Sequence, residues 1–395
     1  MSLTPTETAR VRRDGAASGH VVTHPDRRGW LPALLDAPGR CAQGLVHPPA
    51  PLGEARPDLD HVASVARKSR RANGYLSVDP ELRAFECAAG LVTFATSGRT
   101  AFIVGGPHTG GQPAHIPALL SSFVEAARAS GYRQVLLFPV LGTERDASLE
   151  AGFDTVPTGV EAFVDLQHLD FRGRAFADLR QMRNRARRRY GASVAELSPT
   201  RDRAAMEQVY ARWLAERPAA HRMTLVVGKP ALDAPRGRRY FGVSTPQGLQ
   251  AFLSVVPCFD GSGWGVDVMA RPRATPAGAM DLLISDAALA LRREGARVFS
   301  LGACPMALRG VPATPSHWLL RGIFWYLYRS FLGNRLFNFR SLHHYKRKFA
   351  PDWEPVYMAA WPRVSARALY VGCGMWGLFG APWRIGAREH EPRGS

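Results

Sequence analysis

Cysteine is scarce in this chain, and its cysteines are not arranged in pairs. The 395 residues include five cysteines, an odd number, and no two of them form a Cys-x-x-Cys pair. A disulfide framework uses an even set of cysteines, and a structural zinc site uses closely spaced pairs. The sequence therefore argues against both, and we expect reduced thiols in a cytoplasmic protein at Cys41, Cys87, Cys258, Cys304 and Cys373.

Long apolar runs are also missing. The N-terminus has no uninterrupted apolar segment, so no signal peptide is evident. The longest apolar run, from Ala368 to Trp383, is interrupted by four glycines and one proline. Because such a run is too short and too rich in glycine for a transmembrane helix, we expect it to pack on the body or to contact a membrane interface. The expected location is cytoplasmic, and a peripheral position at the inner face of the membrane is the alternative.

The sequence lacks a well-formed phosphate-binding loop. The glycines at 105, 106, 110 and 111 are not followed by the Lys and the helix-opening Ser or Thr of a P-loop. Residues 188–193, RRYGAS, approach the Q/R-x-x-G-x-G/A loop of acetyltransferases but end in Ser. That loop cradles the CoA pyrophosphate, so its absence weighs against an acyl-CoA donor. His108 and His115 are isolated, and we expect neither a metal site nor a cofactor.

Acidic residues are nearly absent from two stretches that carry most of the positive charge. The formal net charge is +18. Eight arginines and one acid, Asp178, lie between Arg172 and Arg189, and five cations without an acid lie between Arg335 and Lys348. Aromatic residues alternate with the cations of the second stretch. This pattern is typical of a surface that binds a polyanion, either nucleic acid or lipid head groups; the alternative is a solvated basic face over buried aromatics.

The order of the expected elements indicates a mixed α/β fold in two copies. A hairpin (90–96 and 100–106), a helix (115–130) and strands (134–140 and 161–166) are followed by a second hairpin, helix and strand. The predicted organisation is a mobile leader (1–58), an N-terminal domain (59–170), a basic linking helix (171–200), a C-terminal domain (201–364) and a Gly-rich apolar tail (365–395).

The linking helix is amphipathic in an unusual way. Leu179, Met182, Ala186 and Tyr190 lie on one face at helical spacing, and Arg180, Arg183 and Arg187 lie on another. Without a counter-anion so many arginines would repel one another. The helix either contacts phosphates or pairs with acids elsewhere in the fold.

Several blocks of the chain resemble one known family. Residues 264–306, WGVDVMARPRATPAGAMDLLISDAALALRREGARVFSLGACPM, and 337–362, FNFRSLHHYKRKFAPDWEPVYMAAWP, are similar to the catalytic domain of phosphatidylglycerol lysyltransferases, the multiple peptide resistance factors. The likeness extends over roughly residues 60–362. It implies a tandem GNAT fold, an aminoacyl-tRNA donor and transfer of the amino acid to a lipid hydroxyl.

The chain departs from that family at a few points. It has no polytopic flippase domain, which leaves lipid export unsupported and the acceptor open. His343 and His344 stand where the family more often has basic residues, and Ala270 stands where Arg is usual. Arg271 is expected to take over that role.

The resemblance and the chemistry of acyl transfer together select candidate residues. Such transfer needs a group for the donor ammonium or the acceptor proton, an oxyanion donor and cations for phosphate. Asp267, mid-strand between valines, is the candidate for the first role, with a structural Asp as the alternative. The remaining catalytic candidates are Arg271, Lys346 and Lys348, the substrate-binding candidates are Arg340, Asn338 and Glu216, and the tRNA-binding candidates are Arg180, Arg183, Arg187, Arg188 and Arg347.

The leading functional hypothesis is transfer of an amino acid from aminoacyl-tRNA to a phosphatidylglycerol-type lipid. The expected partners are aminoacyl-tRNA, an anionic lipid or a small hydroxyl or amine acceptor, and a membrane surface. The alternatives are transfer to a soluble metabolite, an acyl-CoA N-acyltransferase, and a non-catalytic membrane- or RNA-binding protein.

Overall fold

The structure is a computed structural model that describes residues 52–53, 56–216, 228–308, 311, 317–329 and 339–375. Most of the expected leader, residues 376–395 of the expected tail and the candidate Asn338 lie outside the described residues. The elements of the N-terminal half are α1 (Leu59–Ala66), η1 (Ala72–Ser77), β1 (Arg83–Cys87), β2 (Gly90–Ser97), β3 (Thr100–His108), η2 (Pro113–His115), α2 (Ile116–Ala129), β4 (Gln134–Leu141), α3 (Gly142–Glu150) and β5 (Asp154–Asp165).

The second half begins with a connecting helix. Its elements are η3 (Arg174–Phe176), α4 (Ala177–Tyr190), β6 (Ser193–Leu197), α5 (Arg203–Ala215), β7 (Arg239–Thr245), β8 (Gly248–Cys258), η5 (Phe259–Gly261), β9 (Gly263–Ala270), α6 (Ala279–Arg293), β10 (Val298–Pro305), α7 (Trp318–Arg329), α9 (Phe339–Arg347), β11 (Asp352–Trp361) and α10 (Ala366–Met375). The mixed α/β prediction is confirmed, because each half carries an antiparallel hairpin, a helix and a parallel strand pair.

Apolar periodicity predicts the elements that have one buried face. The 115–130 pattern becomes α2, whose Ile116, Leu119, Leu120 and Phe123 are all buried against β2, β3 and β4. In the same half the predicted hairpin forms with Ser97 paired to Thr100. Burying such faces stabilises the packed layers by about 25 cal/mol for each Å² of apolar area removed from contact with water.

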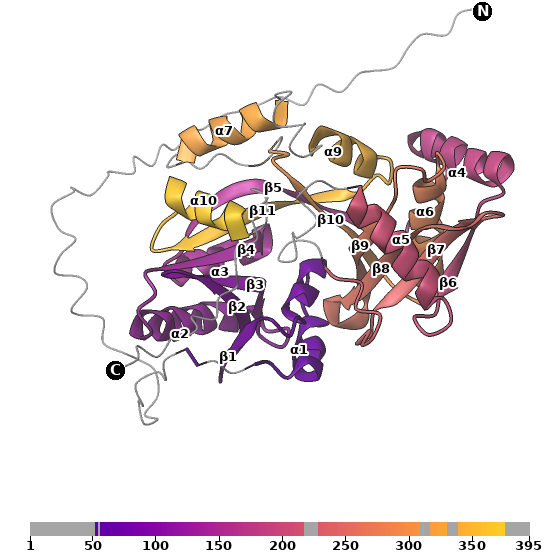
Figure 1. Cartoon of the computed structure of the whole chain (residues 1–395). Helices are drawn as coiled ribbons and strands as arrows, with labels where there is room; N and C mark the ends of the chain where they lie inside the picture. The colour runs from indigo at the N-terminus through magenta and orange to yellow at the C-terminus, as the bar shows by residue number, and fades with distance from the viewer. Residues whose placement is uncertain are drawn as a thin grey trace, which may run out of the picture. The chain divides into compact units, whose positions relative to one another are not determined.

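All eleven strands of the described residues form one sheet, in the order β1-β2-β3-β4-β11-β5-β10-β9-β8-β7-β6 (Figure 1). The last strand, β11, is antiparallel to both of its neighbours, β4 and β5, which belong to the N-terminal half. The strand β11, which comes last in the chain, thus lies in the middle of the sheet. The domain boundaries named above stay predictions.

Two predicted segments differ from the observed ones. The strand expected near 161–166 begins already at Asp154. Part of the expected tail, Ala366–Met375, forms a helix that buries Ala368 and Met375 on the sheet. Across the described ranges, no helix has both the length and the hydropathy required to cross a bilayer.

His108, at the end of β3, is a buried histidine. It is 3% exposed, and its Nε2 lies 2.6 Å from the Ser77 Oγ of η1. Nδ1 has no hydrogen-bond partner in the structure. Burial, and then the charge of Arg71, lower the pKa of His108 to about 3.

This histidine should make the fold sensitive to mild acid. Between pH 6.5 and 3 the imidazole of His108 is protonated in the unfolded chain but stays neutral in the folded protein. The free energy of unfolding therefore falls as the pH drops. Urea unfolding at pH 7.5 and pH 5 should show a loss of about 2 kcal/mol from this group. His108→Gln, whose side-chain amide can keep the Ser77 bond, should lose that much less; equal losses in both proteins would contradict the assignment.

Candidate functional site

The parallel strands β9 and β10 separate partway along their length. Their pairing runs from Gly263 and Val298 to Gly265 and Ser300 and then ends. Beyond Ser300 the strand β10 makes a bulge and stays paired with β5 instead. The backbone edge of β9 that follows Gly265, including Asp267, is therefore released from β10, and this parting is the candidate active site.

Asp267 lies in this released part of β9, but its carboxylate is buried. Its side chain is 3% exposed and accepts a hydrogen bond from Nε of Arg238, itself 3% exposed, at 3.0 Å. Burial raises the pKa of Asp267, while Arg238 and Ser254 oppose the rise. A side chain at Gly228 would collide with this carboxylate, so only a glycine lets the backbone pass so close above it. The buried carboxylate thus has an arginine partner that sequence reasoning missed.

Tyr240 completes the polar surroundings of this pair. Its hydroxyl donates to the carbonyl of Pro230 at 2.6 Å. Burial raises the pKa of Tyr240 to about 12, with Arg238 opposing and Asp267 adding to the rise. The phenol is thus a neutral hydrogen-bond donor at neutral pH, and it helps to hold the chain that crosses Asp267.

Lys346, predicted to face phosphate or an oxyanion, points into the protein instead. The residue is 4% exposed, and its Nζ donates to the carbonyls of Gly302 and Ala303 at 2.9 and 3.0 Å. Burial lowers the pKa of Lys346, and Cys304 and Glu161 oppose the change. The ammonium group therefore ties α9 to the bulge of β10, at the point where β10 leaves β9.

Glu161, on β5, is a buried carboxylate that sequence reasoning did not single out. It is 0% exposed; Oε1 accepts from the Ser300 hydroxyl at 2.6 Å, and Oε2 has no partner in the structure. Burial raises the pKa of Glu161, and Ser300, Lys346 and Arg71 oppose the rise. An acid inside the apolar strand 159–164 was the available signal, because an unpaired buried charge is costly.

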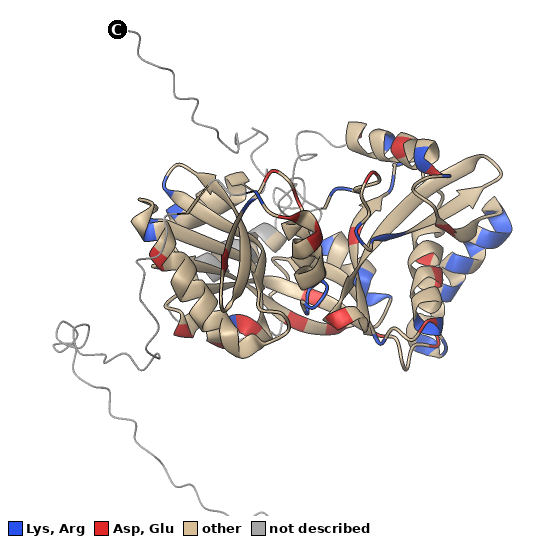
Figure 2. Cartoon of the chain, turned by 90° about the horizontal axis from the view of Figure 1, so that it is seen from below, with Lys and Arg blue, Asp and Glu red and all other residues tan. Residues whose placement is uncertain are grey.

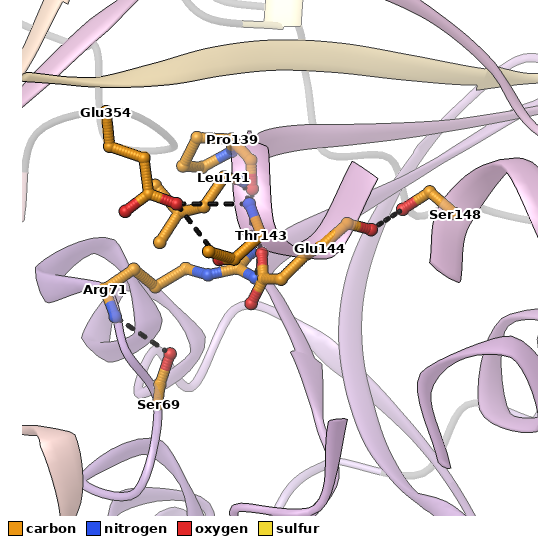
Figure 3. Close-up of polar contacts among 8 residues, drawn as sticks. All are labelled: Ser69, Arg71, Pro139, Leu141, Thr143, Glu144, Ser148 and Glu354. Carbon is orange, nitrogen blue, oxygen red and sulfur yellow. Dashed lines mark hydrogen bonds and ion pairs between the residues drawn. The ribbon is translucent and has the colours of Figure 1, made fainter. Parts of the chain in front are cut away.

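Arg71 forms a second buried connection, between the segment after α1 and the turn that joins β4 to α3 (Figure 3). It is 1% exposed, donates to the Pro139 carbonyl at 2.7 Å and forms an ion pair with Glu144. Burial lowers its pKa to about 10. Beside it, Glu354 of β11 accepts hydrogen bonds from the backbone and hydroxyl of Thr143. Glu354 thereby connects β11 to the start of α3.

Lys348 connects α9 to two other helices. Its Nζ lies 3.1 Å from Asp178 of α4 and 3.3 Å from Asp281 in the first turn of α6. The two basic stretches of the sequence therefore come together here. Lys348 is, however, already neutralised by two acids. Phe349, which follows Lys348, is buried in the hydrophobic cluster that also contains Leu179 of α4 and Leu282 of α6.

Helix α4 lies against the start of α6. A side chain at Gly278, the residue before α6, would collide with the Met182 carbonyl of α4. The acidic Asp281 follows within the first turn. Gly191, from the RRYGAS segment, ends α4 instead of opening a helix. The RRYGAS segment therefore does not provide the helix start that a phosphate-binding loop uses.

The arginines of α4 fall into two groups. Arg183 and Arg187 bind the two oxygens of Asp286 on α6 at 2.9 and 2.8 Å, and Arg180 donates to the Phe171 and Gly173 carbonyls. Arg185, Arg188 and Arg189 are exposed and make no ion pair within the described part of the chain. Figure 2 shows the resulting band of cations at the right of the view.

The other candidates are dispersed. Arg271, Arg340 and Arg347 are exposed, and the carboxylate of Glu216 accepts from the Arg273 backbone at 2.5 Å, near the start of α6. No hydrogen bond or ion pair links Asp267 to Lys346 or Lys348 in the described ranges. Those ranges also contain no group of three His, Cys, Asp or Glu side chains placed to hold a metal ion.

Comparison with known proteins identifies relatives of the whole arrangement. The family model for phosphatidylglycerol lysyltransferase, C-terminal, matches residues 63–360. A phosphatidylglycerol lysyltransferase from Bacillus subtilis (strain 168) is 25% identical over 316 residues, which cover 78% of this chain and 36% of that protein. The chain thus spans little more than a third of this curated relative.

Solved structures share the fold. L-PGS from Bacillus licheniformis superposes with a TM-score of 0.65 at 22% identity, over 82% of this chain and 97% of that one. A C-terminal domain from Agrobacterium fabrum named after lysylphosphatidylglycerol synthetase gives a TM-score of 0.65 at 22% identity, over 80% and 94% of the two chains. With the family match over residues 63–360, the two-part mixed sheet places this chain in the phosphatidylglycerol lysyltransferase C-terminal domain family.

Proposed function

We propose that this chain is an aminoacyltransferase that moves an amino acid from aminoacyl-tRNA to the hydroxyl of a phosphatidylglycerol-type lipid. The observation that carries the proposal is the family match over residues 63–360. The parted strands β9 and β10 support it, because they release strand edges in the middle of the sheet. We further propose that the enzyme works in the cytoplasm.

The chemistry needs little more than positioning. The acceptor oxygen attacks the carbonyl carbon of the aminoacyl ester and forms the new ester bond. The bond to the tRNA ribose oxygen breaks, and the acceptor proton ends on that oxygen. Holding both reactants together can supply about 7–11 kcal/mol of the barrier.

Each site residue has a proposed part in this reaction. Asp267, with its pKa raised, receives the donor ammonium or the acceptor proton, and Arg238 sets the carboxylate's orientation. Lys346 is a positioning residue, because it acts through the carbonyls of Gly302 and Ala303. The unpaired arginines of α4 offer charge for the tRNA phosphates.

The test is a transfer assay with the full chain. Purified protein, tRNA charged with labelled amino acids and phosphatidylglycerol vesicles should give label in the organic extract, and ribonuclease added beforehand should remove it. Running each aminoacyl-tRNA separately identifies the amino acid.

Other outcomes contradict parts of the proposal. Label that stays in the aqueous phase with a soluble acceptor would replace the lipid. Transfer from a CoA thioester that survives ribonuclease would exclude the tRNA donor. Tight tRNA or vesicle binding without any turnover would point to a non-catalytic protein.

A further inference from the structure

Helix α7 carries a row of exposed aromatic side chains. Trp318 is 74% exposed, Trp325 58% and Tyr326 60%, which are unusual values for residues of this size. With Arg329 they recur at steps of seven, one and three residues, which places them on one face of the helix. Tyr328, on another side, packs against the core cluster around Val160. The helix is therefore seated on the protein by one face and presents tryptophans on another.

The charged residues within α7 and α10 are all arginines. The guanidinium of Arg329 lies 5.1 Å from the centre of the Trp325 ring. Helix α10 and the residues before it add exposed Arg363, Arg367 and a 60% exposed Tyr370. Neither helix contains Asp or Glu. Trp and Tyr prefer the polar boundary of a bilayer, and arginine is attracted to anionic head groups.

One carboxylate holds both helices at their starts. Asp154, the first residue of β5, accepts from the His317 ring at 2.9 Å through one oxygen and from the Val364 backbone at 2.9 Å through the other. His317 precedes α7, and Val364 lies two residues before α10. The aromatic and cationic side chains thus belong to one anchored unit, and the two helices lie close together in Figure 1.

We propose that α7 and α10 form a docking surface for an anionic lipid bilayer. The helices lie on the membrane without crossing it: tryptophan and tyrosine rings enter the head-group region, and arginines contact lipid phosphates. The assignment to a bilayer follows from charge, because the charged residues within both helices are arginines, which complement an anionic surface. It deepens the proposed function, on which its biological meaning rests, by bringing the lipid acceptor to the enzyme.

The docking surface is separate from the arginine helix. Helix α10 packs on the β4 side of the sheet through Ala368 and Gly372, whereas α4 precedes the edge strand β6 at the other end of the strand order. The two sites can therefore be tested one at a time. Tyrosines and tryptophans with such exposure can be truncated at little cost in stability.

The experiment is vesicle flotation of the full chain, without tRNA. Vesicles of phosphatidylcholine mixed with phosphatidylglycerol should carry the protein upward, and pure phosphatidylcholine should carry much less. W318A/W325A should lower the partition coefficient of the protein between water and these vesicles roughly tenfold, since each ring contributes apolar area at the interface. Leu149→Ala, which truncates an exposed apolar residue on α3, is the matched control and should leave flotation unchanged.

Three results would contradict the docking surface. The first is unchanged flotation of W318A/W325A, and the second is flotation that is lost only when the α4 residues Arg185 and Arg188 are replaced. The third is a protein that does not bind vesicles but forms a stable dimer, which W318A/W325A dissociates. Because no donor is present, an inactive enzyme that still floats contradicts only the proposed function. An active enzyme that does not float contradicts only the docking surface.

Discussion

Replacing Asp267 with Asn should abolish aminoacyl transfer and also weaken the fold. The substitution removes the only charge in hydrogen-bond contact with Arg238 among the described residues, and both side chains are 3% exposed. Loss of one partner of a buried pair costs about 3–5 kcal/mol, because the other charge is left uncompensated. Loss of a general base or ammonium ligand lowers turnover by about 100-fold or more. Urea unfolding and the transfer assay measure the two effects separately.

A double variant separates structure from chemistry. In Asp267→Leu/Arg238→Met both charges are replaced by apolar groups of similar size, which should recover most of the lost stability. Turnover should stay absent, and tRNA binding should match that of the parent protein. If the double variant transfers the amino acid at the parent rate, the pair is only structural and Asp267 is not in the active site.

Removing two unpaired arginines from α4 should weaken tRNA binding strongly. Arg185→Gln/Arg188→Gln deletes two exposed cations and keeps good helix formers in their place. If each contacts one phosphate, the slope of log K against log salt falls by about 2, and affinity in 0.1 M salt falls roughly 50-fold. Filter binding of tRNA across a salt series measures both quantities.

A control with the same change in charge shows whether position matters. Arg99 and Arg133 are exposed in the N-terminal half, before β3 and β4 and far along the strand order from α4. Arg99→Gln/Arg133→Gln should keep at least most of the parent affinity and slope. Equal losses in the two double variants would mean that tRNA senses only net charge, and α4 would no longer be its binding surface.

Secondary structure was predictable wherever a segment has one solvent-exposed face and one buried face. The α2 residues Ile116, Leu119 and Phe123 recur at helical spacing because they face the sheet, and the hairpin turn at 97–100 lies between two apolar strands. The concentration of positive charge in two stretches was also predictable, because it depends on composition alone.

Other parts of the site were beyond such patterns. Lys346 and Lys348 lie two residues apart in one basic stretch, yet one is buried on the carbonyls of Gly302 and Ala303 and the other binds acids of α4 and α6. Composition treats them alike, because the direction of each side chain depends on which strand lies beneath the helix. The same holds for Arg183 and Arg188, of which only the first forms an ion pair with an acid among the described residues.

The amino-acid sequence by itself determined the local elements, the excess of positive charge and, through its family likeness, the reaction to look for. These depend on neighbours in the chain, whose periodicity and charge can be read directly. Tertiary structure alone decided that β11 joins β4 to β5, that Asp267 pairs with Arg238, and that Glu161, Ser300 and Lys346 gather where β10 leaves β9. Those contacts join residues that are far apart in the chain, and the energetic need to pair each buried charge selects them only once the sheet is assembled.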